Sequence, residues 1–408
     1  MEFKEAIIYK NDKYKIMKKI LIIILLSVGI FAMAQEPEGY KFESIYDHAT
    51  TSVKDQNRSG TCWSFSGLSF LESELLRLGK KPVDLSEMFV VRNCFSLKAD
   101  KYVRMHGAIN FSAGGAFFDV LYVLKNFGIV PENIYTGLNY GSEKHVHGEV
   151  DAVLRNYVDA IIKNPNRELS ISWKSGFEGV LDAYFGVLPE TFTVDGKTYT
   201  PQSYAKEAVG LNLDDYVQIG SYTHHPFYSP FIIEIPDNWI WESIYNVPLD
   251  EMITIMKESL KNGYTIAWGG DVSEKGFSFK NGVAVVPETE IAEMAGSERE
   301  KWESLSAEEL DKRLYSFEKP LKEKVITQEL RQQGFDNYLT ADDHGMHITG
   351  MSKDQNGTIY FKIKNSWNTV NVYDGYLYAS ENYVRHKTIS IMVHKNAIPK
   401  DIRQKLNL

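Results

Sequence analysis

Residues 55–79 decide the fold of this chain. They read Asp55-Gln56-Asn57-Arg58-Ser59-Gly60-Thr61-Cys62-Trp63-Ser64-Phe65 and continue to Gly79 as Ser-Gly-Leu-Ser-Phe-Leu-Glu-Ser-Glu-Leu-Leu-Arg-Leu-Gly. From Phe65 to Leu78 apolar residues recur every three or four positions, which is the period of one buried helix face. Gly79, followed by two lysines, is a typical helix end. The pattern predicts a buried helix with Cys62 in its first turn.

Cys62 has the surroundings of a reactive thiol. The thiolate is the nucleophilic form of cysteine, and the free N–H groups and positive dipole end of a helix N-terminus favour that anion. The turn Arg58-Ser59-Gly60 presents the sulfur at a surface. Gln56 precedes Cys62 closely, so its side-chain amide and the backbone N–H of Cys62 are candidate donors to an oxyanion beside the sulfur.

A cysteine at the start of an apolar helix is also commonly a small buried hydrophobic residue, so its role depends on partners elsewhere. Residues 343–350 and 358–367 are strand-like runs on either side of Asp354-Gln355-Asn356-Gly357, which predicts an antiparallel hairpin. Alternation places Asn365 on the apolar face of the second run, with Phe361, Ile363 and Trp367. A polar group on a core face needs a hydrogen-bond partner, and His344 on the neighbouring strand can supply it.

These residues together make a nucleophile, a base and an orienting group. His344 would take the proton of Cys62 and later protonate a leaving amine, while Asn365 would hold the imidazole in one tautomer. Trp367 would cover the hydrogen bond between them. His347 is the alternative base. His344 and His347 could also suggest a metal pair, but strand residues three positions apart point to opposite faces and cannot share an ion without a bulge.

The motif Gln56-x5-Cys62-Trp63-Ser64-Phe65, followed far downstream by Asn365-Ser366-Trp367, resembles the active-site segments of papain-type cysteine peptidases. It differs from the papain and cathepsin signature at Ser59, which replaces a cysteine, and at Thr61, which replaces Ser or Ala. This variant, with His344-Gly345-Met346, is closer to the bleomycin hydrolase and aminopeptidase C branch.

The resemblance implies an α+β fold, in which a helical lobe faces an antiparallel, β-barrel-like lobe. It implies hydrolysis of peptide amide bonds through a thioester acyl-enzyme, with Cys62, His344 and Asn365 catalytic and Gln56 in the oxyanion site. It also places the pair Gly114-Gly115 in the substrate cleft, together with Trp63 and Trp367. No metal or organic cofactor is expected. A catalytically silent binding protein that kept the fold is the alternative from another functional class.

Cys62 and His344 lie farther apart in the sequence than in compact papain relatives. We therefore expect a peptidase domain over residues 35–408 with insertions at about 136–248 and 288–333. Within the first insertion, residues 161–175 and 177–186 carry helical patterns. Residues 216–245 are rich in aromatic residues and resemble the insertion between the two lobes of bleomycin hydrolases.

In bleomycin hydrolase relatives a terminal arm enters the cleft, and its carboxylate binds the free amino group of the substrate. Residues 395–408 are short for such an arm, and the run from Pro399 to Leu406 has a helical pattern. Aminopeptidase action, endopeptidase or dipeptidase action, and the homo-oligomer that relatives form therefore all stay open.

Met17-Lys18-Lys19, an apolar run over residues 20–31 and Ala32-Met33-Ala34 have the three parts of a secretory signal peptide. We expect residues 1–34 to be removed, with Met17 as an alternative translation start and an uncleaved anchor as the other interpretation. No stable membrane span remains after cleavage, and the protein would be exported to a periplasm or outside the cell.

The rest of the composition limits the partners. A net charge of -9 without a Lys- or Arg-rich patch makes nucleic acid an unlikely partner and leaves peptides as the expected substrates. The second cysteine, Cys94, is expected to be a buried, unpaired thiol, because a bridge to Cys62 would consume the nucleophile. The histidines of the first insertion lack ligands at zinc spacing and are expected to be solvated: His145, His147, His224 and His225.

Overall fold

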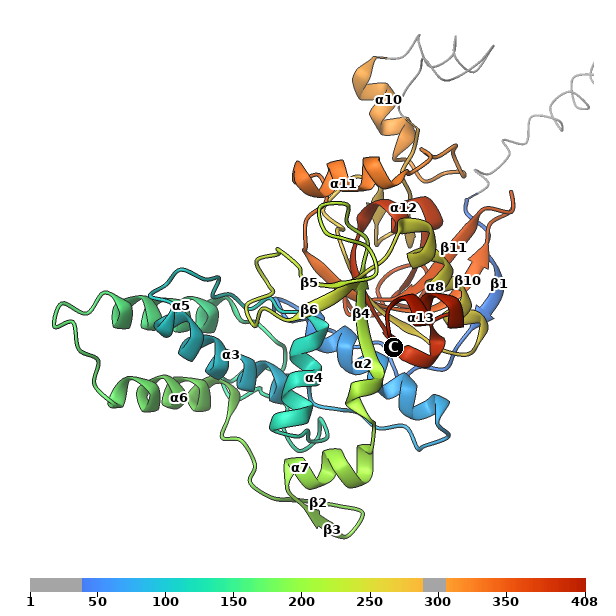
Figure 1. Cartoon of the computed structure of the whole chain (residues 1–408). Helices are drawn as coiled ribbons and strands as arrows, with labels where there is room; N and C mark the ends of the chain where they lie inside the picture. The colour runs from blue at the N-terminus through green and yellow to red at the C-terminus, as the bar shows by residue number, and fades with distance from the viewer. Residues whose placement is uncertain (1–38, 289–305) are drawn as a thin grey trace, which may run out of the picture.

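A computed structural model describes residues 39–288 and 306–408. The expected signal peptide at residues 1–34, and part of the expected insertion at 288–333, lie outside the described residues. Within those ranges, no helix is both long enough and apolar enough to cross a bilayer. Figure 1 shows a helical part beside a part built on one large sheet, which confirms the α+β class.

The helical part surrounds α2 (Cys62–Arg77), which is buried on nearly all sides. Its apolar stripe from Phe65 to Leu75 is almost inaccessible to solvent. The helix ends before Gly79, whose φ of 74° is a left-handed conformation that glycine adopts without strain. The other long helices of this part are α3 (Glu87–Arg104), α4 (Phe117–Asn126), α5 (Gly148–Ile162) and α6 (Ser172–Phe185).

The expectation of a helix over residues 161–175 is wrong. Helix α5 ends at Ile162 and α6 begins only at Ser172. Pro165 lies between them, and proline lacks the N–H that a helix interior needs and disfavours helical geometry at the residue before it. Residues 177–186 do fall largely within α6, as predicted.

The second part is an open, mixed sheet of 11 strands rather than a closed barrel. Its path is β5-β6-β4-β13-β7-β10-β11-β12-β9-β8, and β1 pairs with β10 off this path. Pairs β4–β6 and β9–β12 are parallel and the others antiparallel. The strands are β1 (Glu43–Asp47), β4 (Tyr216–Gly220), β5 (Pro230–Ile232), β6 (Ser243–Asn246), β7 (Ile266–Gly270), β8 (Phe277–Ser278), β9 (Val283–Ala284), β10 (His344–Lys353), β11 (Ile359–Lys364), β12 (Tyr376–Ser380) and β13 (Thr388–His394).

The predicted hairpin is present as β10 and β11, joined around Asn356-Gly357. Strand β10 lies between β7 and β11 and packs against α2, so the sheet brings His344 to the N-terminal end of that helix. At this contact, a Cβ on Gly345 would approach Ser66 Oγ to 2.8 Å. A residue without a side chain is therefore needed for the strand to approach the helix so closely.

Shorter elements complete the fold. Residues 136–248 are not one appended unit, because β4 at their end pairs with β13 inside the main sheet. They also contain the hairpin of β2 (Phe192–Val194) and β3 (Lys197–Tyr199), and α7 (Pro201–Tyr204). Around the sheet lie α8 (Leu249–Lys261), α10 (Ala307–Leu314), α11 (Gln328–Asp336), α12 (Glu381–Lys387) and α13 (Lys400–Lys405). Helix α13 was predicted; Ile402 within it and Leu406 directly after it are buried in the apolar core of the sheet part.

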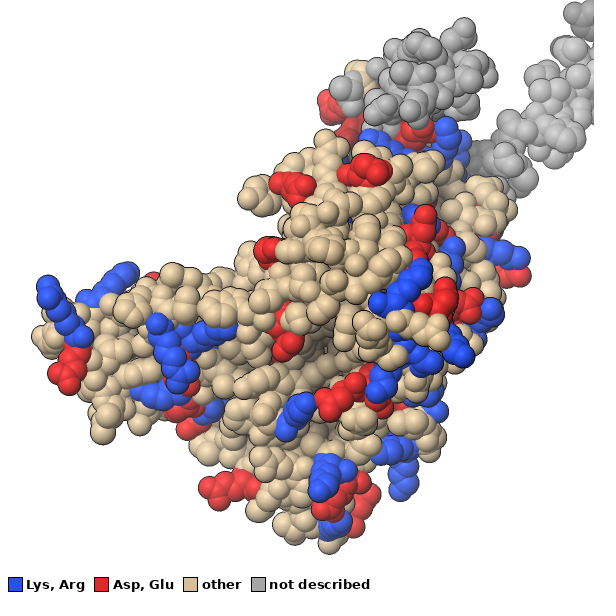
Figure 2. All heavy atoms as spheres, in the orientation of Figure 1, with Lys and Arg blue, Asp and Glu red and all other residues tan. Residues whose placement is uncertain are grey.

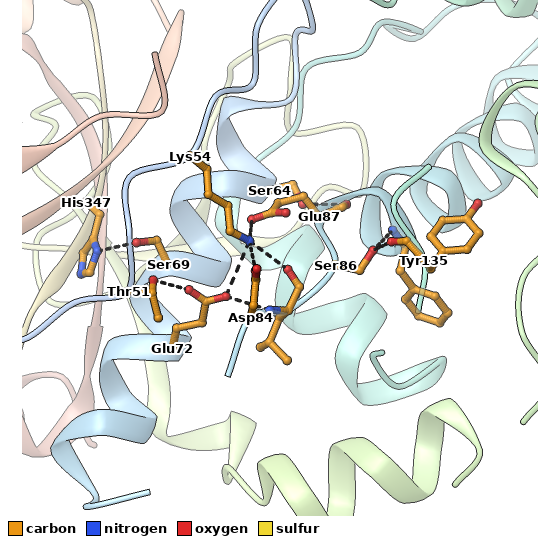
Figure 3. A network of polar contacts seen from close by, with 12 residues as sticks. Thr51, Lys54, Ser64, Ser69, Glu72, Asp84, Ser86, Glu87, Tyr135 and His347 are labelled. Atoms are coloured by element: carbon orange, nitrogen blue, oxygen red, sulfur yellow. Dashed lines mark hydrogen bonds and ion pairs between the residues drawn. The ribbon is translucent and has the colours of Figure 1, made fainter. Parts of the chain in front are cut away.

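A buried ion network fixes the segment that precedes Cys62 (Figure 3). Lys54 Nζ lies 2.6 Å from Glu87 Oε1, 3.9 Å from Glu72 Oε1 and in contact with Asp84. Glu72 also accepts a hydrogen bond of 2.5 Å from Thr51. Burial raises the pKa of Glu87 to about 8, so its anionic form depends on the lysine beside it.

We expect Lys54→Met to lower the free energy of unfolding by about 3 kcal/mol at pH 8, because it removes the cation nearest to the buried carboxylates of Glu72 and Glu87. The loss should shrink at pH 5, since Glu87 is then protonated in the folded state and needs no cation. Urea unfolding at both pH values measures this difference. Lys353→Met is the matched control, because its ion pair with Glu43 is largely exposed and should contribute below about 1 kcal/mol. Equal losses for the two variants would contradict the prediction.

Candidate active site

A cleft opens between the helical part and the sheet, at the N-terminal end of α2. Its wall comes from both parts and from the loop after β5: Cys62, Trp63, Gly115, Ala116, Phe117, Ile235, Asp237, Gly269, Asp342, Asp343, His344, Gly345 and Ser390. Four of the eight residues assigned from the sequence are in this wall, namely Cys62, Trp63, Gly115 and His344. The cleft therefore brings together the cysteine and the histidine from opposite ends of the chain.

Cys62 is the first residue of α2, as predicted. The backbone N–H of Gly345 donates a hydrogen bond of 3.4 Å to its Sγ, so β10 reaches the sulfur directly. Burial raises the pKa of the Cys62 thiol to about 12, and the hydrogen bond from Gly345 opposes that shift. At neutral pH the thiol therefore ionises only if a neighbouring group takes its proton.

His344 lines the same cleft and is the candidate for this role. Its Nε2 and Asn365 Oδ1 are 2.8 Å apart, and its ring stacks on Trp367 with centroids separated by 4.5 Å. Asn365 Oδ1 also accepts from the N–H of Ser366, so this end of the amide is an acceptor and the proton of the neutral imidazole lies on Nε2. Nδ1 is left as the basic nitrogen. Burial lowers the pKa of His344 to about 4, while the hydrogen bond to Asn365 raises it.

Gln56 is held in one orientation by hydrogen bonds and is not among the residues of the cleft wall. Ser366 Oγ donates to its Oε1 at 2.6 Å, and its Nε2 donates to the carbonyl of Ser59 at 2.8 Å. The side-chain nitrogen thus points toward the turn before Cys62, and its second N–H is not used by that bond. The backbone N–H of Gln56 donates to Ser366 O, which ties this segment to the residue after Asn365.

The glycine pair is required by close packing. A Cβ on Gly115 would lie 2.8 Å from the Trp63 ring, and one on Gly114 would collide with the carboxylate of Asp237. Trp63 is buried and donates from Nε1 to the carbonyl of Ala113 at 3.0 Å. In the wall beside Cys62, Gly115 therefore packs against Trp63, and Gly114 next to it packs against Asp237.

Sequence reasoning missed three carboxylates of the cleft: Asp237, Asp342 and Asp343. Asp342 and Asp343 directly precede His344 in the sequence, so their place near the candidate base could have been predicted. Asp237 gave none, because it lies on a loop that folds back over the glycine pair from a distant part of the sequence.

The remaining titratable candidates lie elsewhere. His347 faces away from the cleft: its Nδ1 is 3.0 Å from Ser69 Oγ, and it lines a separate buried cavity. His145 and His147 are buried rather than solvated, which corrects the expectation for them. Their rings pack near Phe65 and Phe185, and burial lowers the pKa of each to about 4.

His224, His225 and Glu234 form the one group among the described residues whose ligand atoms are close enough for a metal ion. The hydrogen bonds favour a different arrangement. The N–H of Thr223 donates to Gln332 Oε1, so Gln332 Nε2 is a donor to His224 Nδ1. The proton of neutral His224 then lies on Nε2, facing Glu234 at 3.2 Å, where a metal would need a lone pair.

Cys94 is free and buried, as predicted. On the face shown in Figure 2, Lys and Arg side chains are interspersed with Asp and Glu rather than gathered in one patch.

Two family models match separate segments of the chain. The papain family cysteine protease model matches residues 38–171, and the peptidase C1-like family model matches residues 292–408. One segment contains Cys62 and the other contains His344 and Asn365. The chain belongs to the papain-like cysteine peptidases.

The relatives that it matches are aminopeptidases, and the chain resembles the aminopeptidase C branch. Aminopeptidase C of Lactobacillus delbrueckii subsp. lactis is 21% identical over 406 residues, which cover 87% of this chain and 82% of the relative. Aminopeptidase G of the same organism is 22% identical, with 88% and 84% covered. The crystal structure of PepW from Lactobacillus rhamnosis HN001 shares the fold, with a TM-score of 0.66 at 18% identity over 90% of this chain and 84% of that one.

Proposed function

We propose that this peptidase cleaves amide bonds of peptides through a thioester on Cys62, and that it acts as an aminopeptidase. The observation that carries the proposal is the cleft itself, in which Cys62 and a His344 held by Asn365 at 2.8 Å share one wall. The names of the relatives support aminopeptidase action.

In the proposed reaction, His344 Nδ1 takes the proton of the Cys62 thiol as the sulfur attacks the substrate carbonyl carbon. Burial disfavours either charge alone, so thiolate and imidazolium form together as a pair. The imidazolium then gives its proton to the leaving amine as the C–N bond breaks, which leaves an acyl group on sulfur. A water molecule, deprotonated by His344, hydrolyses the thioester and releases the carboxylic acid.

The tetrahedral intermediate carries a negative oxygen that needs donors. The backbone N–H of Cys62, at the first position of α2, has no acceptor within its own helix. The N–H of Gln56 that is not bound to Ser59 is the second proposed donor. Asn365 and Trp367 orient and cover the imidazole, and Trp63 with the glycine pair forms the wall along which the peptide lies.

The test uses peptides that differ only at the amino end. We expect stoichiometric inactivation by a thiol-directed epoxide, and cleavage of aminoacyl and dipeptidyl fluorogenic amides with a free amino group at least ten times faster than of their acetylated forms. Equal rates for the two sets would favour endopeptidase action instead. The absence of any turnover, equal to that of Cys62→Ala, would favour the silent binding protein.

Export belongs to the same proposal and rests on the signal-like residues 17–34. N-terminal sequencing of the protein from its native source should then begin at Gln35, and a chain that retains residues 17–34 would contradict export by cleavage.

A further inference from the structure

The cleft beside Cys62 contains more carboxyl groups than its proposed chemistry uses. Asp237, Asp342 and Asp343 all line it, and none of the residues described in its wall is Lys or Arg. Both Asp237 and Asp342 are close enough to Cys62 to raise the pKa of its thiol. Negative charge near a thiolate hinders its formation, so these carboxylates do not serve the nucleophile.

Asp237 is placed to hold a ligand. Asn110 Nδ2 donates to its Oδ1 at 3.2 Å and Ser112 Oγ at 3.5 Å, which fixes the carboxylate against Gly114. Within the described part of the chain, no hydrogen bond reaches Oδ2. The carboxylate therefore has one oxygen without a hydrogen bond, and it lies beside Gly114, next to the wall residues Trp63 and Gly115.

Asp342 lines the same cleft. Its Oδ2 is buried and has no hydrogen-bond partner in the described residues. Burial raises its pKa to about 8, and the charges of Asp237 and Asp343 add to this shift. A buried carboxylate without a partner costs free energy that a bound cation would recover.

Nearby groups of the protein do not supply that cation. The positive charge of Lys98 lowers the pKa of both Asp237 and Asp119. However, the hydrogen bonds of Lys98 Nζ go to the carbonyls of Gly114 and Ser112 and not to either carboxylate. Trp239 Nε1 and the N–H of Ala116 both donate to Oδ2 of Asp119, so this carboxylate is already held by the protein on one side, although its Oδ1 has no partner in the described residues. Residues 395–408 contribute nothing to the wall, since they pack beneath α8.

We propose that Asp237 and Asp342 bind the α-ammonium group of the peptide substrate and so fix where Cys62 cuts. The inference rests on the proposed peptidase function. A substrate that extends from Cys62 along the glycine pair meets Asp237 at Gly114, where its main chain would have to continue. The cation that reaches this position is therefore the end of the main chain, and the cleft accepts only the short amino-terminal part of a peptide.

The experiment compares wild type with Asp237→Asn and Asp342→Asn on matched substrates. Each dipeptidyl fluorogenic amide is used with a free amino group, with an acetylated one, and with lysine or norleucine as its first side chain. Both variants should lose about 10- to 100-fold in kcat/KM on free-amino substrates, the loss expected for a hydrogen bond to a charged group. Acetylated substrates should change by less than about threefold, so the preference for a free amino end should collapse.

Asp214→Asn is the control, because Asp214 is an exposed residue paired with Lys125 on the surface. Alkylation of Cys62 by uncharged iodoacetamide should be unchanged or faster in both cleft variants, which excludes damage to the nucleophile as the cause of the loss. If wild type cleaves peptides but the preference for a free amino end survives both substitutions, the inference is wrong and the proposed function stands. A loss confined to substrates with lysine would also overturn the inference, because the two carboxylates would then bind the lysine side chain and not the α-ammonium group. If wild type cleaves none of these peptides, the proposed function itself fails.

Discussion

The Cys62→Ala protein should fold as wild type does and hydrolyse peptides at least about 10⁴-fold more slowly. Removal of a covalent nucleophile costs far more than the loss of any single contact, because the remaining groups stabilise a transition state that can no longer form. The expected loss appears in kcat, since the walls that bind the peptide remain. Steady-state rates on a free-amino dipeptidyl amide measure it, with circular dichroism to show that the fold is kept.

Cys94→Ala is the matched control for that result. Cys94 is the other cysteine, buried and unpaired within the helical part, and it does not line the cleft. Its substitution should leave kcat/KM within about threefold of wild type and leave one equivalent of the epoxide still incorporated. If Cys94→Ala abolished labelling while Cys62→Ala retained it, the assigned nucleophile would be wrong.

His344→Ala should lower kcat by about 10³- to 10⁴-fold and change how thiol reactivity depends on pH. Burial sets the pKa of Cys62 at about 12 and that of His344 at about 4 when each ionises alone. In wild type the imidazole accepts the thiol proton, so alkylation by iodoacetamide should already be fast near neutral pH. Without the imidazole, the thiol must lose its proton to solvent, and alkylation should rise only in the alkaline range, above about pH 9.

His347→Gln separates the two candidate bases. His347 is on the same strand as His344, but its side chain contacts Ser69, which also binds Lys364, and does not line the cleft. For His347→Gln, kcat and the pH profile of alkylation should therefore stay close to those of wild type. A variant of His347 that reproduced the alkaline shift would contradict the assignment of His344. Asn365→Ala should give a smaller loss than His344→Ala, because it removes only the group that holds the ring.

The parts of the site that the sequence predicted are those encoded by local patterns. The helix that begins at Cys62 follows from apolar spacing, and the hairpin that carries His344 and Asn365 follows from alternation around Asn356-Gly357. Asn365 is a polar residue on an apolar face, which predicted a partner on the neighbouring strand. Its hydrogen bond with His344 confirms this prediction.

What the sequence did not predict depends on contacts between distant segments. The position of Asp237 follows from a loop after β5 that folds onto Gly114, and no periodicity marks it. His145 and His147 carry no pattern that distinguishes a buried ring from a solvated one, and tertiary packing decides the matter. Strand β4 joins the main sheet by pairing with β13, which lies more than a hundred residues later in the chain. No local pattern predicts such a pairing.

The segment before Cys62 and the segment after Asn365 are paired through backbone hydrogen bonds. Gln56 N donates to Ser366 O at 2.9 Å, and Asn368 N donates to Lys54 O at 3.2 Å. These hydrogen bonds link the segment that leads into α2 to the segment that follows β11, and so join the two parts that form the cleft. A hinge motion that widened the cleft would have to break these hydrogen bonds and would move Cys62 away from His344. We therefore expect the width of the cleft to stay constant. We therefore expect extended peptides to enter the cleft more readily than folded proteins.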